Sequence, residues 1–315
     1  MSCDQALMGT TAPGRDRHDS IWSCRWSSAT MVTMTQPLLA HQTPAGRMYA
    51  RSTRDAPQVP SITTVIAQQP ADLTGWASYM ATQALITDTR LPQALGSGPK
   101  LKALARHANE AASQYRDQAA ERGDRVHYYA EQVARAQLGQ SHQVPQARQL
   151  LVEHAETAFA DRFDEWWENY QVRALAAEVT VWNHTVGYAG TLDLVAEIGG
   201  RICLIDYKTK GTTRDGRVKP LDEKVVMQLT AGMKAEESLR DADQGSWVPW
   251  EFGHDAVLLA VALGETEAVA YQARPEVLAD HWRKFWSLRQ AWEYARVVEN
   301  TPPALRPIAP PARAR

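Results

Sequence analysis

Apolar and polar positions follow a helical period through the first part of the chain and a strand-like period after it. Four early stretches repeat apolar residues at helical spacing with few breakers, and we predict helices over 71–86 (which includes Trp76), 100–119, 121–138 and 145–171. The pattern then shortens to runs rich in β-forming residues, and we predict strands over 174–182, 190–198 and 201–207. A helical half is therefore followed by a sheet.

Both kinds of pattern return in the last third of the chain. Here we predict a helix over 221–239, strands over 256–263 and 268–272, and a final helix over 275–298. Pro275 suits the start of that helix, where a missing N–H costs nothing. The strand 201–207 has apolar residues facing both sides, as expected inside a sheet that is covered on both faces. We predict an α/β fold, with a mixed central sheet flanked by helices and a helical N-terminal part.

The two ends of the chain differ from its middle. Residues 1–55 are rich in Ser, Thr, Met, Arg and Pro without lasting periodicity, and we predict that they are disordered. Met31 or Met34 is an alternative to Met1 as the true start. Residues 301–315 are rich in Pro, Ala and Arg, which is typical of a flexible tail. No internal repeat or long linker interrupts 56–300, so we expect one domain there.

Composition narrows the class of protein. The 315 residues carry 34 Lys and Arg against 36 Asp and Glu, a net charge of −2 that gives no global case for a nucleic-acid partner. No 18-residue apolar run and no compact N-terminal apolar region are present, so we expect neither a membrane span nor a secretory signal. Cys3, Cys24 and Cys203 are too few for a disulfide framework. We expect a cytoplasmic protein.

The strongest chemical signal lies around the dipeptide Gly199-Gly200. Two apolar runs flank it, which predicts a two-residue hairpin turn because both central positions need φ > 0. In that register Asp206 faces Asp193, and directly opposed residues lie about 4.5–5.5 Å apart at Cβ. Two like charges at this distance need a compensating cation. Lys208 follows two residues later and therefore lies on the same face as Asp206.

Two carboxylates and an amine at one sheet edge are typical of a divalent-metal site with a catalytic lysine. Carboxylate oxygens are hard ligands that suit Mg²⁺ or Mn²⁺ rather than zinc. Lys208 would orient a metal-bound water, lower its pKa or neutralise charge on a phosphate. The alternative is an ordinary salt bridge between Asp206 and Lys208 at a strand end.

Four short motifs carry a resemblance to a known family. They are Gly123-Asp-Arg-Val-His127-Tyr-Tyr-Ala-Glu131, Gly190-Thr-Leu-Asp193, Leu204-Ile-Asp206-Tyr-Lys208-Thr209 and Val225-Val-Met-Gln228-Leu. Together they resemble the PD-(D/E)XK nuclease superfamily, and within it the RecB-like exonuclease branch, over about residues 120–235. Two upstream segments look, more loosely, like RecB-like nucleases encoded by actinobacterial phages: Pro60-Ser-Ile-Thr-Thr-Val and Leu73-Thr-Gly-Trp76-Ala.

The resemblance implies a restriction-endonuclease-like core and a role for each matching residue. The implied metal ligands are His127, Asp193 and Asp206, with the Tyr207 carbonyl as a possible further one. Lys208 would be the catalytic lysine, and Gln228 would position Lys208 or the phosphate. Glu131 lies one turn after His127 and would orient the histidine or metal-bound waters. Glu178, on the preceding strand, is within plausible reach of the metal.

Two departures from the family pattern bear on these expectations. The branch often has a tyrosine four residues after the glutamine, where this chain has Gly232. Its loss would weaken the positioning of a DNA end or phosphate more than metal binding. Many CRISPR-associated relatives hold an iron–sulfur cluster through three cysteines near the C-terminus, but no cysteine follows Cys203 here. We therefore expect no cluster.

The segment after the lysine is locally basic. It contains Lys210, Arg214, Arg217 and Lys219, which we predict to contact a DNA backbone, since phosphates attract Lys and Arg without reading sequence. The alternative is a mobile polar loop.

The activity implied is a metal-dependent deoxyribonuclease, an exonuclease on linear single- or double-stranded DNA in phage recombination or DNA processing. The bacterial host cytoplasm would then be its location. An endonuclease of the same fold is one alternative, and a non-catalytic DNA-binding or partner-dependent subunit is another. No G-x-x-x-x-G-K-[ST] motif appears, so a helicase or recombinase partner would be a separate chain.

Overall fold

The central feature of the fold is a seven-stranded mixed sheet. In the computed structural model residues 37–309 are described, and every element below belongs to the unit Val32–Arg315. The strands are β4 (Arg173–Asn183), β5 (Tyr188–Ile198), β6 (Arg201–Thr209), β7 (Glu237–Asp241), β8 (Ser246–Pro249), β9 (Val257–Leu263) and β10 (Ala268–Gln272). Their order is β10-β9-β6-β5-β4-β7-β8, with β6 and β9 parallel and the other neighbours antiparallel.

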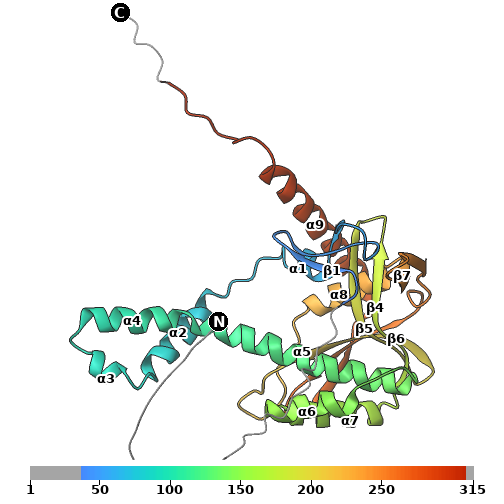
Figure 1. The fold of residues 1–315 in the computed structure, drawn as a ribbon, viewed down its shortest axis with the longest axis horizontal. Coiled ribbons are helices and arrows are strands. Elements are labelled where there is room, and N and C mark those ends of the chain that lie inside the picture. The colour runs from blue at the N-terminus through green and yellow to red at the C-terminus, as the bar shows by residue number, and fades with distance from the viewer. Residues whose placement is uncertain (1–36, 310–315) are drawn as a thin grey trace, which may run out of the picture. The chain divides into compact units, whose positions relative to one another are not determined.

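Helices cover both faces of the sheet, as Figure 1 shows. On one side lie α5 (Ala111–Gln137), α6 (Val144–Glu153) and α7 (Thr157–Asn169), and on the other α8 (Lys224–Met233) and α9 (Pro275–Glu299). Strand β6 contributes side chains to the hydrophobic clusters on both faces of the sheet. Ile205 packs in the cluster that holds Phe163 of α7, whereas Leu204 packs with Leu229 of α8. Burial of one strand from two sides confirms the prediction for 201–207.

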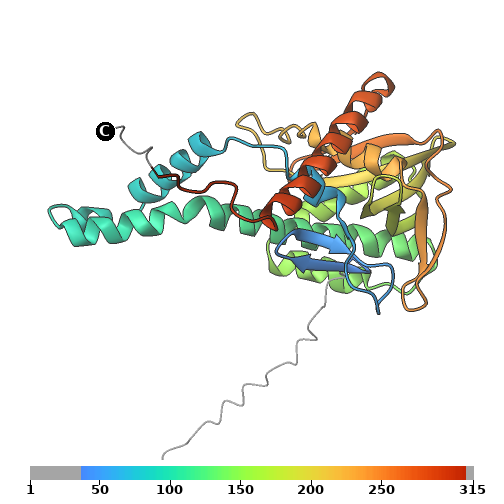
Figure 2. The same ribbon diagram turned by 90° about the horizontal axis from the view of Figure 1, so that it is seen from above.

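The predicted architecture is confirmed. The protein is α/β, with a mixed sheet flanked by helices and a helical N-terminal part, an arrangement consistent with a restriction-endonuclease-like core. The remaining helices are α1 (Ile62–Ile66), α2 (Thr74–Ile86), α3 (Leu91–Ala94) and α4 (Gly98–Asn109). Helices α2 and α4 pack against each other and against α5 (Figure 2). The Trp76 ring of α2 is edge-on to the Tyr115 ring of α5, with centroids 5.9 Å apart. None of the helices described is long and apolar enough to cross a membrane.

The helix predicted over 221–239 is wrong at its C-terminal end. The helix ends at Met233, and Glu237–Asp241 forms β7, which pairs with β4 and β8. The Trp247 ring of β8 packs edge-on to Trp182 of β4 at 5.6 Å. These contacts come from residues distant in sequence, and such pairing overrides a local helical pattern.

The disorder predicted for residues 1–55 is wrong where the structure describes them as strands. β1 (Ala40–Thr43) and β2 (Gly46–Tyr49) form a hairpin, and β3 (Val59–Pro60) completes a small sheet. Tyr49 is buried beside Trp182 and Ala189, and its hydroxyl lies 2.9 Å from Thr191 Oγ1. Each strand is too short to show a period, and the residues that bury Tyr49 lie more than a hundred positions away along the chain.

Parts of the two terminal predictions lie outside the described residues. These include residues 1–36, with the alternative starts Met31 and Met34, and residues 310–315. Residues 301–309 form no helix or strand and are exposed.

A close contact holds this N-terminal segment against the central sheet. Ser61 caps α1, its hydroxyl accepting a hydrogen bond from the Thr64 N–H at 2.9 Å. Ile62 then lies directly over Gly190 of β5, where a Cβ atom would meet Ile62 Cδ1 at 2.5 Å. The glycine of the Gly190-Thr-Leu-Asp193 motif therefore permits α1 to approach the strand three residues before Asp193.

Candidate active site

The β5–β6 hairpin brings the two aspartates together. Gly199 and Gly200 have φ of 58° and 76°, as a tight hairpin turn of this kind requires. Five pairs, from Ile198↔Arg201 to Leu194↔Ile205, confirm the predicted register. Continuing it by one step places Asp206 beside Asp193. The Tyr207 N–H donates to Asp193 Oδ2 at 2.8 Å, which ties the Asp193 side chain to the backbone of β6.

A third carboxylate falls in the same row. Ala177 pairs with Leu194 and Val179 with Leu192, so Glu178 of β4 lies opposite Asp193. Glu178 has φ of 50°, in the left-handed region that is costly for a residue other than glycine. Three acidic residues thus follow one another across β4, β5 and β6. We call Glu178, Asp193 and Asp206 the carboxylate row.

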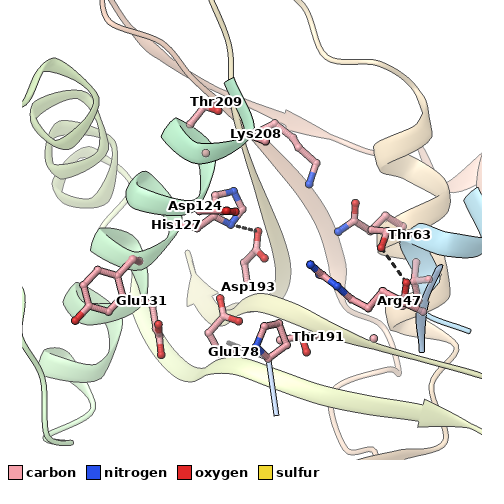
Figure 3. Close-up of a pocket in the computed structure, with 18 of the residues that line it drawn as sticks. Arg47, Thr63, Asp124, His127, Glu131, Glu178, Thr191, Asp193, Lys208 and Thr209 are labelled. Carbon is pink, nitrogen blue, oxygen red and sulfur yellow. Dashed lines mark hydrogen bonds and ion pairs between the residues drawn. The ribbon is translucent and has the colours of Figure 1, made fainter. Parts of the chain in front are cut away.

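Helix α5 contributes the predicted histidine. His127 Nδ1 lies 3.5 Å from Asp193 Oδ2 (Figure 3). The imidazole ring is edge-on to the Tyr207 ring, with centroids 6.0 Å apart. Tyr207 packs in turn against Phe163 and Trp166 of α7, at 5.5 and 5.8 Å. An aromatic cluster behind the site therefore supports the ring that points at Asp193.

Asp206 has a different set of partners. Lys208 Nζ lies 2.9 Å from Asp206 Oδ1 and 2.7 Å from Oδ2, and Gln228 Nε2 of α8 donates to Oδ1 at 2.5 Å. Gln228 therefore hydrogen-bonds to the Asp206 carboxylate and not directly to Lys208. The resemblance implied that Gln228 positions either Lys208 or the phosphate. Asp206 is buried, whereas the Lys208 side chain is 36% exposed and lines the cavity.

Burial and crowded negative charge raise the pKa of two members of the row. Burial is the largest influence on Asp206; the Lys208 ammonium opposes it and Asp193 reinforces it, so that the pKa is raised to about 6. Burial, with the charges of Asp193 and Glu131, raises the pKa of Glu178 to about 8. Burial and like charge thus favour the neutral form of Glu178 more strongly than the neutral form of Asp206.

The cationic and anionic side chains of the pocket stabilise each other's charged forms. Burial works to lower the pKa of His127, but the attraction of Asp193 and the hydrogen bond with it outweigh burial, and the pKa rises to about 9. Burial favours neutral Asp193, but His127 and then Lys208 outweigh it and hold its pKa below the usual value. The charge of Asp206 likewise outweighs burial and raises the pKa of Lys208. Without a metal ion both groups are therefore held in their charged forms at neutral pH, whereas a ligating His127 would have to be neutral.

The residue types suit a divalent cation of the Mg²⁺ or Mn²⁺ kind. Carboxylate oxygens predominate, with one imidazole. Asp206 Oδ2 is buried and has no aligned hydrogen-bond donor, although Lys208 Nζ is near. In residues 37–309, however, no three His, Cys, Asp or Glu side chains are gathered as a ready metal site. The types of ligand atom therefore fit such a cation. In this arrangement, however, Asp193 and Asp206 accept hydrogen bonds from other residues of the protein.

The other predicted residues lie around this centre at varying distance. Glu131 lines the cavity but accepts a hydrogen bond from Arg135 Nε at 2.7 Å rather than orienting His127. Lys210 lines a smaller neighbouring cavity together with Lys208 and Gln228. The remaining basic residues of the loop are exposed and line neither cavity: Arg214, Arg217 and Lys219.

Sequence reasoning missed the wall of the cavity that faces this acidic centre. The cavity measures about 390 Å³, within the range of about 300–1,000 Å³ that is usual for ligand pockets. Its further lining comes from the N-terminal segment and the start of β5, and includes Arg47, Tyr49, Ser61, Thr63 and Thr191. In the sequence, Pro60-Ser-Ile-Thr is marked only by its loose likeness to phage-encoded nucleases. Arg47 had no signal, because its stretch shows no period.

Comparisons with known proteins add little to the geometry. No protein-family model matches the chain, and no curated protein matches it. Among solved structures, it is similar to a "putative exonuclease" from Eubacterium rectale at 13% identity, covering 57% of this chain and 76% of that one, with a TM-score of 0.31. A protein designated SSO0001 matches at 14% identity, over 52% and 76%, with a TM-score of 0.23. At such TM-scores these likenesses carry no weight for function.

Proposed function

We propose that the protein is a metal-dependent deoxyribonuclease that hydrolyses phosphodiester bonds, acting as an exonuclease on linear DNA. The observation that carries this proposal is the meeting of His127, Asp193 and Lys208 around one cavity, with the buried Asp206 carboxylate paired to Lys208. They come from a helix and two neighbouring strands. The family motifs that they complete belong to nucleases, and the exonuclease preference rests on that resemblance.

The protein's own residues divide the work between them. His127, Asp193 and Asp206 would hold Mg²⁺ or Mn²⁺, with the Tyr207 carbonyl as a further ligand. Such a cation supplies charge neutralisation at the phosphate and a more acidic bound water. Gln228 keeps the Asp206 carboxylate oriented through its hydrogen bond.

Lys208 suits the stabilisation of charge better than proton abstraction. Its ammonium is paired with Asp206 at 2.7 Å, and this pairing raises its pKa against the effect of burial. A lysine that is charged at neutral pH donates hydrogen bonds and cannot act as a base. Its side chain also reaches the cavity, so it is available to a phosphate oxygen that gains charge during bond cleavage.

DNA would approach over the basic loop. Arg214, Arg217 and Lys219 are exposed beside the strand that carries Lys208, and Lys210 lies nearer the site. Such residues attract a phosphate backbone without reading sequence. Phage recombination or DNA processing is the proposed setting, with a separate helicase or recombinase as a possible partner.

A cleavage assay on linear and covalently closed circular DNA tests this function. The assay compares Mg²⁺, Mn²⁺ and EDTA, and it compares the natural protein with Lys208→Ala and with Lys234→Ala. Lys234 is an exposed lysine just after α8 and serves as the matched control. We expect Mg²⁺- or Mn²⁺-dependent loss of linear DNA only, abolished in Lys208→Ala and kept in Lys234→Ala.

Other outcomes of this assay lead to different conclusions. Metal-dependent cutting of the circle, also lost in Lys208→Ala, would replace the exonuclease by an endonuclease. Absence of cleavage by folded protein on both substrates would refute the proposed activity and favour a binding subunit.

A further inference from the structure

Arg47 enters the active-site cavity from the N-terminal hairpin, on a backbone that is held firmly. Its carbonyl accepts hydrogen bonds from the Ser61 N–H at 2.8 Å and from Thr64 Oγ1 at 2.9 Å. The preceding Gly46 has φ of 102° and touches Thr64 so closely that a Cβ there would lie 2.6 Å from Thr64 Cγ2. The β1–β2 hairpin therefore packs closely against the start of α1 at the position of Arg47.

Arg47 as a whole residue is half-buried, and its guanidinium makes no hydrogen bond or ion pair within residues 37–309. Arg51, four residues later, shows the usual alternative. It binds Glu237 at 2.7 Å and lies over the Trp247 ring at 4.2 Å. The Arg47 N–H donors that reach the cavity are therefore free to bind an acceptor supplied by a ligand.

Figure 3 shows where this group points. The Arg47 side chain is directed into the cavity, toward the space that Asp193 and Lys208 also face. Arg47 and Lys208 thus reach the same space from different elements, β2 and β6. Thr63 lines the Arg47 side, with its hydroxyl 3.0 Å from Ser61 Oγ. Glu178 and Asp193 give the cavity an acidic wall beside His127, and Arg47 and Lys208 give it a cationic side.

We infer that Arg47 binds a backbone phosphate of the nucleic acid inside this cavity, opposite the carboxylate row. A guanidinium presents paired N–H donors that match two oxygens of one phosphate, whereas the Lys208 ammonium acts as a point charge. The acidic wall repels a phosphate, and Arg47 supplies attraction from the far side. This inference rests on the proposed function, because it names the substrate contact of that same site, and it assigns the N-terminal hairpin a role in substrate binding.

A phosphate contact has a signature that a structural role lacks. Each neutralised phosphate releases counterions, so binding weakens with salt by a fixed slope. For single-stranded DNA the slope of log K against log salt is about −0.7 per contact. A residue that merely supports the fold would change stability without changing this slope.

The experiment measures binding of a short, fluorescent single-stranded oligodeoxynucleotide by anisotropy, over a series of salt concentrations, with Ca²⁺ in place of Mg²⁺. The variants are Arg47→Gln, Arg47→Lys and Arg54→Gln. Arg54 lies in the same segment, is exposed and does not line the cavity, so the last variant makes the same chemical change elsewhere. Thermal unfolding of each variant reports on folding.

We expect Arg47→Gln to raise Kd by about tenfold to a hundredfold, as the loss of a charged hydrogen-bond pair does. It should also reduce the salt slope by about 0.7. Arg47→Lys should keep the slope and bind at an intermediate level, because it keeps the charge but loses the paired donors. Arg54→Gln should match the natural protein.

The inference and the proposed function fail in different ways. Equal binding and equal salt slope for Arg47→Gln and Arg54→Gln would overturn the phosphate contact, even if the protein cleaves DNA. A weaker, less salt-dependent Arg47→Gln in a protein without nuclease activity would uphold the contact and refute the function. Absence of oligonucleotide binding by the natural protein would overturn the contact. If Arg47→Gln unfolds, Arg47→Lys decides through its binding.

Discussion

Replacing Asp193 by Asn should lower the pKa of His127, because it removes a negative charge that stabilises the protonated ring. The amide is isosteric with the carboxylate, and its oxygen can still accept the hydrogen bond from the Tyr207 N–H. What is lost is the negative charge 3.5 Å from His127 Nδ1. That charge is the main reason why the pKa of His127 lies above its ordinary value in spite of burial. In Asp193→Asn, burial should therefore dominate and bring the pKa to 6.5 or below.

The magnitude follows from the pKa. A rise from 6.5 to about 9 corresponds to roughly 3 kcal/mol of interaction favouring the charged ring. The ring is 27% exposed, so solvent screens part of this and the figure is an upper bound. Because the folded-state pKa is the higher one, this stability is fully present below pH 6.5 and is lost as pH rises through about 9. The free-energy difference between natural protein and Asp193→Asn should therefore shrink between pH 6 and pH 9.

Two measurements check this prediction in metal-free protein. NMR titration of the His127 ring, assigned by its absence in His127→Gln, reports the pKa, and urea unfolding at several pH values reports the stability difference. Asp124→Asn is the matched control: Asp124 lines the same cavity on α5 but makes no hydrogen bond or ion pair with His127. Titration of His127 near 6.5 in the natural protein, or an equal change in Asp124→Asn, would refute the reasoning.

Three further predictions concern metal binding, Asp206 and the N-terminal segment. Mn²⁺ at about a hundred times its Kd should raise the free energy of unfolding of the natural protein by about 2.7 kcal/mol and should not raise that of Asp193→Asn. Equal stabilisation of the two proteins in thermal unfolding would argue against a metal site at Asp193. Gln228→Ala removes a hydrogen-bond donor from the Asp206 carboxylate, which should raise the pKa of Asp206 further. The kcat should therefore fall, and the acidic limb of the pH profile of kcat should move to higher pH. An unchanged profile would show that this hydrogen bond does not affect catalysis. Gly190→Ala puts a Cβ 2.5 Å from Ile62 Cδ1 and should cost about 1–3 kcal/mol in urea unfolding, whereas no loss would mean that α1 moves freely.

The parts of the fold that the sequence predicts are those with local signals. The Gly199-Gly200 turn is bounded by two apolar runs, and it sets the β5–β6 register without help from distant residues. The strand over 201–207 is apolar on both faces, and it lies inside the sheet as expected. Both predictions rest on turn geometry and periodicity, which are properties of a few neighbouring residues.

The parts that the sequence could not predict depend on distant contacts. β2 is held through Tyr49, which contacts Thr191 of β5, and β7 is held by pairing with β4 and β8. For the site, the resemblance predicts that Gln228 positions Lys208 or the phosphate, and it does not specify the hydrogen bond from Gln228 to Asp206 Oδ1, the atom that Lys208 also contacts. No local pattern marks Arg47, because its position in the cavity depends on the docking of α1 over Gly190.

Cleavage of end-labelled linear DNA by purified protein, with and without the Lys208 side chain, tests the central claim most directly. In Mg²⁺ or Mn²⁺ the natural protein should cleave the DNA, EDTA should stop it, and Lys208→Ala should lower the rate by about a hundredfold or more, as the loss of a positioned charge in an active site does. Cleavage that persists in EDTA, or that Lys208→Ala performs at the natural rate, would contradict the assignment of this cavity as a metal-dependent nuclease site.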